Sequence, residues 1–473
     1  MITLTVAEIA DLVGGRLDGI DPALPISGKV EFDSRKVAPG DLFLAIKGER
    51  VDGHDYAAAA IQAGAVGILA TRPVPAPAIL VDDPIVAITA LASAVARRLA
   101  ATIIEITGSS GKTSTKDLLA QVLAGHGPTV APPESFNNEL GFPYTVLLAD
   151  AETRYLVLEA SSRGIGHIRQ LTEIAPPALA AVLNVGSAHL GEFGSTAAIA
   201  QAKGELIEAL DSTGVAVLNA DDQLVAAMAE RTAARISWFG TSRVADVRAE
   251  QVRLDDGGRA SFVLVNGSDR AQVSLQLRGE HQVSNALAVA ALAGCCGLAL
   301  PAIAAALSAA TVRSHWRMEV TDTAAGICVV NDAYNANPES MASALSTLAV
   351  LAANRRAVAV LGEMAELGAG SAEAHRDLGR RVAELGIDEL VVVGEPARPI
   401  VEGALGQPGW AGRADWVPDN AAAAVLLRDR LGAGDVLLVK GSRAADLQQV
   451  AAAVLGWAEV GDGATGISEQ ASI

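Results

Sequence analysis

The 473-residue chain has only three cysteines and few aromatic side chains, which make up 3% of its residues. Cys295 and Cys296 are adjacent in a helical pattern and Cys328 lies in an apolar run, so we expect buried thiols of a reducing compartment. A disulfide framework or a zinc site is not expected from this spacing. The chain also lacks a basic excess: 36 Lys and Arg stand against 54 Asp and Glu, a formal charge of −18. This balance argues against a surface that binds nucleic acid.

Long uninterrupted apolar runs are also missing. Glycines or charges such as Arg97 and Arg98 break every apolar stretch within the length that a membrane span needs. The first residues, MITLTVAEIADLVGG, place no basic segment ahead of an apolar core, so we expect no signal peptide. The sequence therefore predicts a cytoplasmic protein without a membrane span. Residues 460–473 are polar and rich in Gly and Ser, which predicts a disordered tail.

The most informative motif is TGSSGKT at residues 107–113, between the apolar run ATIIEI and a helical pattern. A glycine turn between a strand and a helix N-terminus offers backbone N–H groups and a positive dipole end to a phosphate. Lys112 can reach the β- and γ-phosphates, and the Thr113 hydroxyl can bind Mg²⁺. The common phosphate-loop pattern GxxxxGK[ST] begins with a glycine, and this chain has Ile106 at that position. The loop therefore matches only a subset of the nucleotide-binding proteins that carry phosphate loops. A lone GKT is often only a surface turn, but its place after an apolar strand favours nucleotide binding. The predicted nucleotide-binding residues are Gly108, Ser109, Ser110, Gly111, Lys112, Thr113 and Ser114.

Apolar runs alternate with helical patterns over most of the chain, which predicts an α/β fold in three parts. Residues 1–83 form a small N-terminal α/β part, and residues 84–313 a central part with a parallel sheet around the phosphate loop. Residues 314–459 contain four further strands, in GICVVNDAYN, RAVAVLGEM, DELVVVGEP and DVLLVKGSR, which predict a Rossmann-like C-terminal sheet.

Candidate metal ligands follow strands of the central part. Glu159 closes YLVLE, and His189 lies five residues beyond the end of AAVLN. Parallel strands end at one edge of their sheet, so Glu159, His189 and Thr113 can converge there as a Mg²⁺ site. Each residue alone also fits an ordinary solvated turn.

Two further polar groups are candidates. The loop ESFNNELGFP at 134–143 carries Asn137 and Asn138, whose amides can bind a sugar or peptide or simply cap a turn. In GEHQVSNALA, His281 and Asn285 lie four residues apart on one helix face, as in any amphipathic helix with polar caps.

Together these motifs carry a family resemblance. TGSSGKTSTKD, ESFNNELGFPYTVL, LEASSRGIGHI, NVGSAHLGEFGS, AKGEL, GEHQVSNALA, NDAYNANPES and LGEMAELG occur in the order seen in Mur ligases. DSRKVAPGDLFLAIKGERVDGHDY near the front resembles the UDP-binding domain of that family. NDAYNANPES is similar to the branch that adds D-alanyl-D-alanine to UDP-MurNAc-tripeptide.

The resemblance implies an ATP-dependent ligase that needs Mg²⁺ and passes through an acyl phosphate, with UDP-MurNAc-tripeptide and D-Ala-D-Ala as substrates. It implies catalytic roles for Lys112, Glu159, His189 and Lys203, with Thr113, Glu159, His189 and Lys203 at the metal. Lys203, in AKGEL, aligns with a lysine that is carbamylated in the family. We also expect a monomer. Further nucleotide contacts implied by the family are His281, Asn285, Arg317, Asn335 and Asn337, and implied substrate contacts are Ser34, Arg35, Asn137, Asn138 and Ser161.

Two alternatives remain open at this point. A sister ligase that adds another amino acid would share the residues of the ATP site. A non-enzymatic scaffold closed by ATP would not need the UDP-binding motif DSRKVAPGDLF, which argues against it. The third residue of the acceptor peptide and the residues that bind the dipeptide are not readable from the sequence.

Overall fold

The computed structural model describes residues 1–48 and 51–460, which fold into two compact units. The first unit comprises Met1–Val185, Ala200–Arg248 and Leu287–Ala306, and the second comprises Gly186–Ile199, Ala249–Ala286 and the chain from Leu307 onward. The predicted tail, 460–473, lies outside the described residues except for Val460, which ends the last helix. The three-part division at residues 83 and 313 stays a prediction.

The first unit begins with a small sheet of strand order β2-β7-β6-β5-β4. Its first helix starts at a capping box, in which Thr5 accepts from the N–H of Glu8 and the Glu8 carboxylate accepts from the N–H of Thr5. Gly14 ends that helix at φ 64°, in the left-handed region that glycine tolerates. The elements of this part are β1 (Leu4–Thr5), α1 (Val6–Val13), β2 (Arg16–Asp18), β3 (Pro25–Ile26), β4 (Val30–Glu31), β5 (Leu42–Leu44), η1 (Gly53–Tyr56), α2 (Ala57–Gln62), β6 (Gly67–Ala70), β7 (Ala78–Leu80) and α3 (Pro84–Ala96).

A parallel sheet with the order β14-β13-β12-β11-β8-β10-β9 forms the middle of the chain. Since all these strands point the same way, the residues that follow β8, β10 and β11 lie at one edge of the sheet. Its elements are β8 (Thr102–Thr107), α4 (Lys112–Ala124), β9 (Thr129–Val130), α5 (Gly141–Val146), β10 (Tyr155–Glu159), α6 (His167–Ile174), β11 (Leu179–Val182), α7 (Leu190–Phe193), α8 (Thr196–Glu208), β12 (Val215–Asn219), α9 (Gln223–Ala226), η2 (Ala227–Arg231), β13 (Arg235–Gly240) and β14 (Val247–Leu254).

One hydrophobic cluster runs through the first unit, from Met1 to Ala234, and includes side chains of both sheets. Three aromatic rings extend it: Phe32 lies edge-on to Tyr144 at 5.2 Å, and Phe136 packs on both. The Tyr144 hydroxyl donates to the buried Glu31 carboxylate at 3.4 Å. Burial, with the nearby Glu31 charge, raises the pKa of Tyr144 to about 12. The N-terminal part therefore shares its core with the phosphate-loop sheet.

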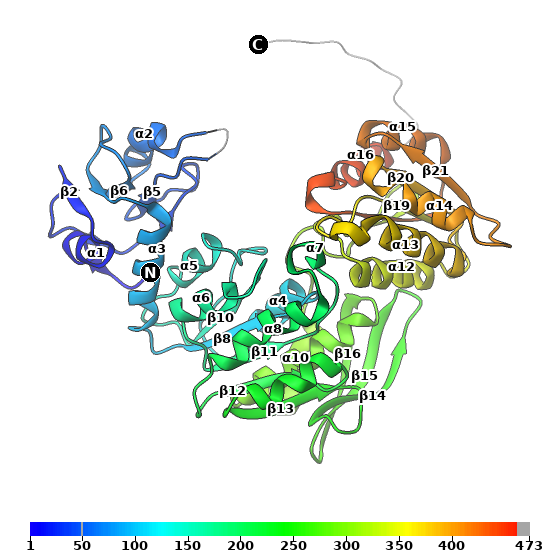
Figure 1. Ribbon diagram of the computed structural model, residues 1–473, viewed down its shortest axis with the longest axis horizontal. Coiled ribbons are helices and arrows are strands. Elements are labelled where there is room, and N and C mark those ends of the chain that lie inside the picture. The colour runs from blue at the N-terminus through cyan, green and yellow to red at the C-terminus, as the bar shows by residue number, and fades with distance from the viewer. Residues whose placement is uncertain (49–50, 461–473) are drawn as a thin grey trace, which may run out of the picture. The chain divides into compact units, whose positions relative to one another are not determined.

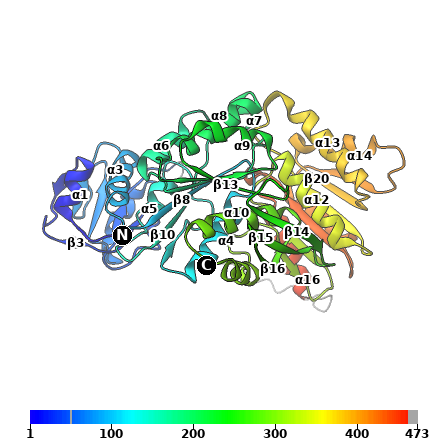
Figure 2. The same ribbon diagram turned by 90° about the horizontal axis from the view of Figure 1, so that it is seen from below.

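The second unit contains a six-stranded sheet of order β17-β18-β22-β19-β20-β21, parallel except at the edge strand β17. Helices α12, α13 and α14 pack on one face, and α15 and α16 on the other (Figures 1 and 2). The four predicted strands are β18, β19, β20 and β22, so the Rossmann-like prediction is confirmed. The elements are β17 (Glu319–Asp322), β18 (Cys328–Asn331), α12 (Pro338–Ala352), β19 (Ala357–Leu361), η3 (Gly368–Gly370), α13 (Ser371–Glu384), β20 (Glu389–Val393), η4 (Glu395–Ala397), α14 (Pro399–Leu405), β21 (Arg413–Val417), α15 (Asn420–Arg430), β22 (Val436–Lys440), η5 (Arg443–Ala445) and α16 (Gln448–Val460).

An antiparallel hairpin precedes this sheet in the chain and was not predicted from the sequence. It pairs β15 (Arg259–Asn266) with β16 (Asp269–Arg278), and helices α10 (His281–Cys295) and α11 (Leu300–Ala309) follow it. Among the described residues, no helix combines the length and the apolar character that crossing a membrane requires.

A buried acid stands in the middle of the central sheet. Glu105 lies on β8 between Leu158 of β10 and Ala180 of β11, and its side chain is fully buried. Neither of its carboxylate oxygens has a hydrogen-bond partner. Burial raises its pKa well above the usual value and so favours the neutral acid in the folded protein.

We expect this acid to make stability depend on pH. The folded-state pKa lies above the unfolded one, so its contribution is fully present below the unfolded pKa of about 4.3 and is lost as pH rises toward the folded pKa. Glu105→Gln, which is neutral at every pH, should match the wild type in melting temperature near pH 4 and exceed it by at least about 2 °C at pH 8. Calorimetry across this range checks the difference. An equal difference at both pH values would contradict it.

Candidate active site

The phosphate loop connects β8 to the first residue of α4. Gly111 precedes that helix at φ 79°, and the Lys112 ammonium donates to the Gly108 carbonyl at 2.8 Å. Asn184, just beyond β11, accepts from the backbone N–H of Ser110 at 2.9 Å and donates back to the Ser110 carbonyl at 3.2 Å. Asn184 therefore fixes the loop's shape. Asn184 ends the predicted strand AAVLN, and no role was predicted for it from the sequence.

The buried Glu159 carboxylate accepts from three side chains at the end of β10. Thr113 donates from the start of α4 at 3.0 Å, Ser135 at 3.1 Å and Asn137 at 2.6 Å. Thr113 and Glu159 are 4% and 1% exposed, so little water competes for this group. A carboxylate beside a hydroxyl next to a phosphate loop is the oxygen-rich donor set that Mg²⁺ prefers, and the residues fit that ion. Ser135 belongs to the predicted polar loop but was not singled out in it.

Lys203 lies on α8 and is 5% exposed. Burial, followed by the charge of Lys112, lowers the pKa of its ammonium well below the usual value. This shift favours the neutral amine, which is the nucleophilic form of a lysine side chain.

His189 lies in the segment Gly186–Ile199, which belongs to the second unit. It has a left-handed backbone (φ 62°) just before α7, and its imidazole Nδ1 contacts the Glu366 carboxylate. Of the three residues expected at one metal site, the structure brings Thr113 and Glu159 together within the first unit. The grouping of His189 with them stays a prediction.

The N-terminal turn of α10 carries the predicted pair His281 and Asn285. Asn285 donates to Gln282 at 2.9 Å, and Gln282 is within 3.1 Å of His281 Nε2. Burial lowers the pKa of His281, the charge of Asp332 opposes this shift, and Lys440 adds to it. His281 therefore belongs to the same charged cluster as Asp332 and Lys440.

Asp332 and Lys440 form an ion pair that the sequence analysis missed. Their atoms Oδ2 and Nζ are 2.6 Å apart, and Lys440 is 2% exposed. Asp332 also accepts from the N–H of Met318 at 3.0 Å, and Lys440 donates to the Asn335 carbonyl at 2.9 Å. Both residues lie at strand ends, Asp332 just after β18 and Lys440 at the end of β22. Their position at a carboxyl edge is the signal that could have identified them.

The other predicted residues of the second unit surround this pair. The Arg317 guanidinium lies 4.2 Å from the ring centre of Tyr334, as in a cation–π contact. Asn335 is exposed. Asn337 caps α12 by accepting from the N–H of Ser340 at 2.8 Å, a structural use of its amide.

The predicted substrate residues fall in two places of the first unit. Arg35 is exposed and pairs with Asp33 at 2.8 Å, next to the half-buried Ser34. Asn138 and Ser161 line a cavity of about 610 Å³ between α3 and α6. The Asn138 amide oxygen also accepts from the N–H of Gly141, so the turn-capping interpretation holds for that atom.

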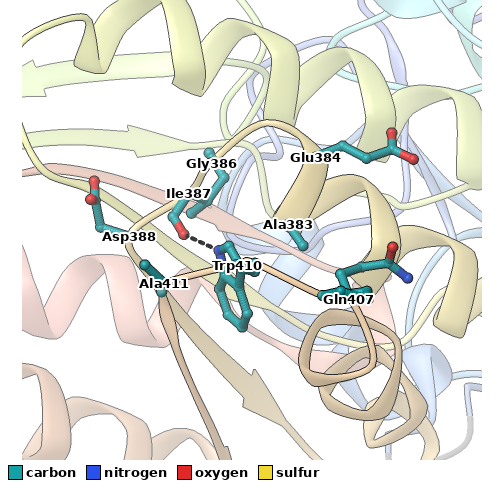
Figure 3. A pocket seen from close by; sticks show the side chains of 11 residues that line it. Ala383, Glu384, Gly386, Ile387, Asp388, Gln407, Trp410 and Ala411 are labelled. Carbon is teal, nitrogen blue, oxygen red and sulfur yellow. Dashed lines mark hydrogen bonds between the residues drawn. The ribbon is translucent and has the colours of Figure 1, made fainter.

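A second cavity, of about 470 Å³, lies in the second unit beside Trp410, whose indole N–H donates to the Ile387 carbonyl at 2.9 Å (Figure 3). It opens where β20 and β21 begin. Ligands of parallel α/β sheets bind at the opposite, carboxyl ends of the strands. None of the predicted site residues lines this cavity.

A phosphate loop beside a buried carboxylate, at the carboxyl edge of a parallel sheet, defines a nucleotide-binding α/β protein. Three family models match this chain: a Mur ligase catalytic domain at 28–112, a Mur ligase middle domain at 106–293 and a Mur ligase glutamate ligase domain at 316–443. The chain belongs to the Mur ligase family.

Similar proteins span nearly the whole chain. A UDP-N-acetylmuramoyl-tripeptide–D-alanyl-D-alanine ligase of Mycobacterium tuberculosis is 48% identical and covers 96% of this chain and 98% of its own length. The crystal structure of MurF from Acinetobacter baumannii is 32% identical, with a TM-score of 0.84 over 96% of this chain and 99% of that one. The structure of MurF ligase from Thermotoga maritima in complex with ADP is 29% identical, with a TM-score of 0.77 over 92% and 99%.

Proposed function

We propose that this protein joins D-alanyl-D-alanine to UDP-MurNAc-tripeptide in the cytoplasm, using ATP, and that it acts as a monomer. The observation that carries this proposal is the match, over 96% of the chain, to a ligase of that name. The phosphate loop and the buried Glu159 carboxylate support the ATP-dependent part, and the likeness to an ADP complex agrees with it.

The reaction has two balanced steps. A terminal carboxylate oxygen of the tripeptide attacks the γ-phosphorus of ATP, and ADP leaves with the electrons of the broken P–O bond. The amine of the dipeptide then attacks the acyl carbon of the resulting acyl phosphate. Phosphate leaves, the amine gives up a proton, and the amide bond of the pentapeptide product remains.

Two anions, the triphosphate and the carboxylate, must approach each other for the first step, and positive charge makes this favourable. The loop residues Gly108, Ser109, Ser110, Gly111 and Ser114 hold the phosphates, and Lys112 moves from the Gly108 carbonyl to the transferring group. Thr113 and Glu159 would hold Mg²⁺, with His189 and Lys203 at a second ion. Bound there, Mg²⁺ would neutralise charge on the phosphoryl oxygens.

The remaining predicted residues bind the substrates. We assign His281, Asn285, Arg317, Asn335 and Asn337 to the nucleotide, and Ser34, Arg35, Asn137, Asn138 and Ser161 to the UDP-MurNAc-peptide. Asn137 also serves Glu159, to which it donates at 2.6 Å.

Lys203 is proposed to carry a carbamate. Its neutral amine attacks CO₂, a C–N bond forms and one proton leaves to water, which converts the neutral side chain into an anion with carboxylate-like oxygens. Hard Mg²⁺ prefers such oxygens, whereas an ammonium there would repel the ion. The burial of Lys203 and its lowered pKa support this step.

The choice of nucleophile is tested by phosphate release from ATP with UDP-MurNAc-tripeptide. We expect release with D-Ala-D-Ala and only background release with single amino acids. Release with a single amino acid but not with the dipeptide would establish the sister-ligase alternative. ATP turnover at the same rate with and without either amine would favour the alternative of a non-enzymatic scaffold closed by ATP.

Lys112→Ala is expected to keep the fold, because the lysine lies at the start of a helix and its ammonium donates to the carbonyl of Gly108 in the same loop. Loss of a charge-assisted contact to phosphate should lower turnover on the order of 10²-fold or more. Steady-state kinetics and a melting curve measure the two effects. A variant with near-normal turnover would show that the loop lysine does not serve catalysis.

Lys203→Ala should impair phosphoryl transfer to the acceptor more than it impairs ATP binding. In the wild type, ¹³C-labelled bicarbonate near neutral pH should give one carbamate NMR signal, and Lys203→Ala should lack it. Lys116→Ala is the matched control, since Lys116 is also buried but pairs with Asp117 at 2.5 Å. Full activity of Lys203→Ala without a change in the carbamate signal would refute this assignment.

A further inference from the structure

The His189 segment, Gly186–Ile199, is attached to the C-terminal part of the second unit at several points. The N–H of Ser187 donates to the Glu339 carboxylate at 2.8 Å, and the N–H of Gly191 donates to the Glu366 carbonyl at 2.8 Å. The first turn of α12, which carries Glu339, and the loop that carries Glu366 thus hold the short segment on either side of His189.

The packing of this segment leaves no space for a side chain at Gly191. A Cβ atom added there would lie 2.5 Å from the backbone nitrogen of Gly368 and 2.9 Å from the Glu366 carbonyl oxygen. Both atoms, and the Gly368 Cα at 2.8 Å, belong to the backbone, which cannot rotate away as a side chain would. The segment therefore sits in one register on the loop that carries Glu366.

His189 and Glu366, whose side chains contact each other, both have an unusual backbone conformation. His189 has φ 62° and Glu366 has φ 63°, in the left-handed region that non-glycine residues seldom adopt. Such conformations persist where surrounding structure demands them. Here they bring the Glu366 carboxylate onto Nδ1 of the His189 imidazole. Glu192 of the same segment is farther away, with its carboxylate 3.7 Å from that nitrogen.

We propose that Glu366 is a positioning residue that sets the tautomer and orientation of His189 for metal binding. In the proposed arrangement the ring turns slightly so that Nδ1–H donates to the Glu366 carboxylate, because the two groups touch without the alignment of a hydrogen bond. The lone pair of the ring then lies on Nε2, the atom that would face a metal ion. Histidines that bind metals in proteins commonly donate their other N–H to a carboxylate, which fixes the ring and raises its basicity. The inference rests on the proposed role of His189 at the second Mg²⁺.

The alternative is that His189, Glu192 and Glu366 bind a cation directly, since one ligand atom from each lies within 4.8 Å of the others. The two arrangements make different demands on Glu366. A ligand needs its negative oxygen at the metal, whereas a positioning residue needs only an acceptor for Nδ1–H. A glutamine keeps that acceptor and loses the charge.

The first measurement uses metal-free protein and therefore does not depend on catalysis. ¹⁵N NMR of histidine-labelled protein at pH 8 should show His189 as the Nδ1–H tautomer in the wild type and in Glu366→Gln. Glu366→Ala should shift it toward the Nε2–H tautomer. Glu192→Gln, the matched control, removes a charge near the same ring and should leave the tautomer unchanged. An unchanged tautomer in Glu366→Ala would overturn the proposal.

The second measurement is Mn²⁺ binding in the presence of ADP, followed by electron paramagnetic resonance. His189→Ala identifies the binding step that depends on the imidazole. Glu366→Ala should weaken that step about 10- to 100-fold, Glu366→Gln should weaken it less, and Glu192→Gln should stay within about twofold of the wild type. Mn²⁺ binding without ADP that both glutamine variants abolish would identify a direct cation site and overturn the positioning role.

The metal role of His189 and the positioning role of Glu366 are tested separately. If His189→Ala changes no Mn²⁺ step, the proposed metal role of His189 is wrong and the role of Glu366 falls with it. If His189→Ala removes a step that Glu366→Ala leaves intact, only the positioning role is wrong. The choice of D-Ala-D-Ala as nucleophile is measured independently by phosphate release. Melting curves of all variants separate these effects from loss of folding.

Discussion

The hydrogen bond from Thr113 to the buried Glu159 carboxylate joins the two elements on which the nucleotide site depends. Glu159 pairs with Ile106 across the sheet, so the end of β10 lies beside the end of β8, where the phosphate loop begins. The loop that contains Ser135 and Asn137 must also reach the end of β10, because both side chains donate hydrogen bonds to the Glu159 carboxylate. The parallel pairing of β8 with β10 thus dictates the path of three chain segments.

Burial gives this site its electrostatic character. The chain carries a formal charge of −18, so a polyanionic nucleotide gains nothing from the protein's overall field. The local field is different, because Lys112 lies in the loop and Lys203 is buried close enough to feel its charge. Removing water strengthens each such interaction and also penalises each uncompensated charge. A buried lysine near another cation is therefore favoured as a neutral group, and an anionic modification there would relieve the repulsion.

Local patterns predicted much of this molecule. The phosphate loop and the four strands of the C-terminal sheet were readable because apolar runs ended at glycines or polar turns. The hairpin β15–β16 was missed although RASFVLVN and AQVSLQLR alternate, because the α/β rhythm on both sides suggested another parallel unit. The Asp332–Lys440 pair joins residues 108 positions apart. Such a pair needs the order β18-β22, which no local pattern contains.

The path of the chain after β11 is the feature of this structure that the sequence predicted least. Asn184 binds the phosphate loop, and the N–H of Val185 donates to Asp222 at 2.8 Å, both within the first unit. The next residue, Gly186, already belongs to the second unit. Two peptide bonds therefore separate Asn184, in the first unit, from Gly186, in the second. The segment that carries Asn184 and the segment that carries His189 are thus directly joined in the chain but belong to different units. The periodicity of the sequence does not reveal this boundary, because it treats neighbours in the chain as members of one domain.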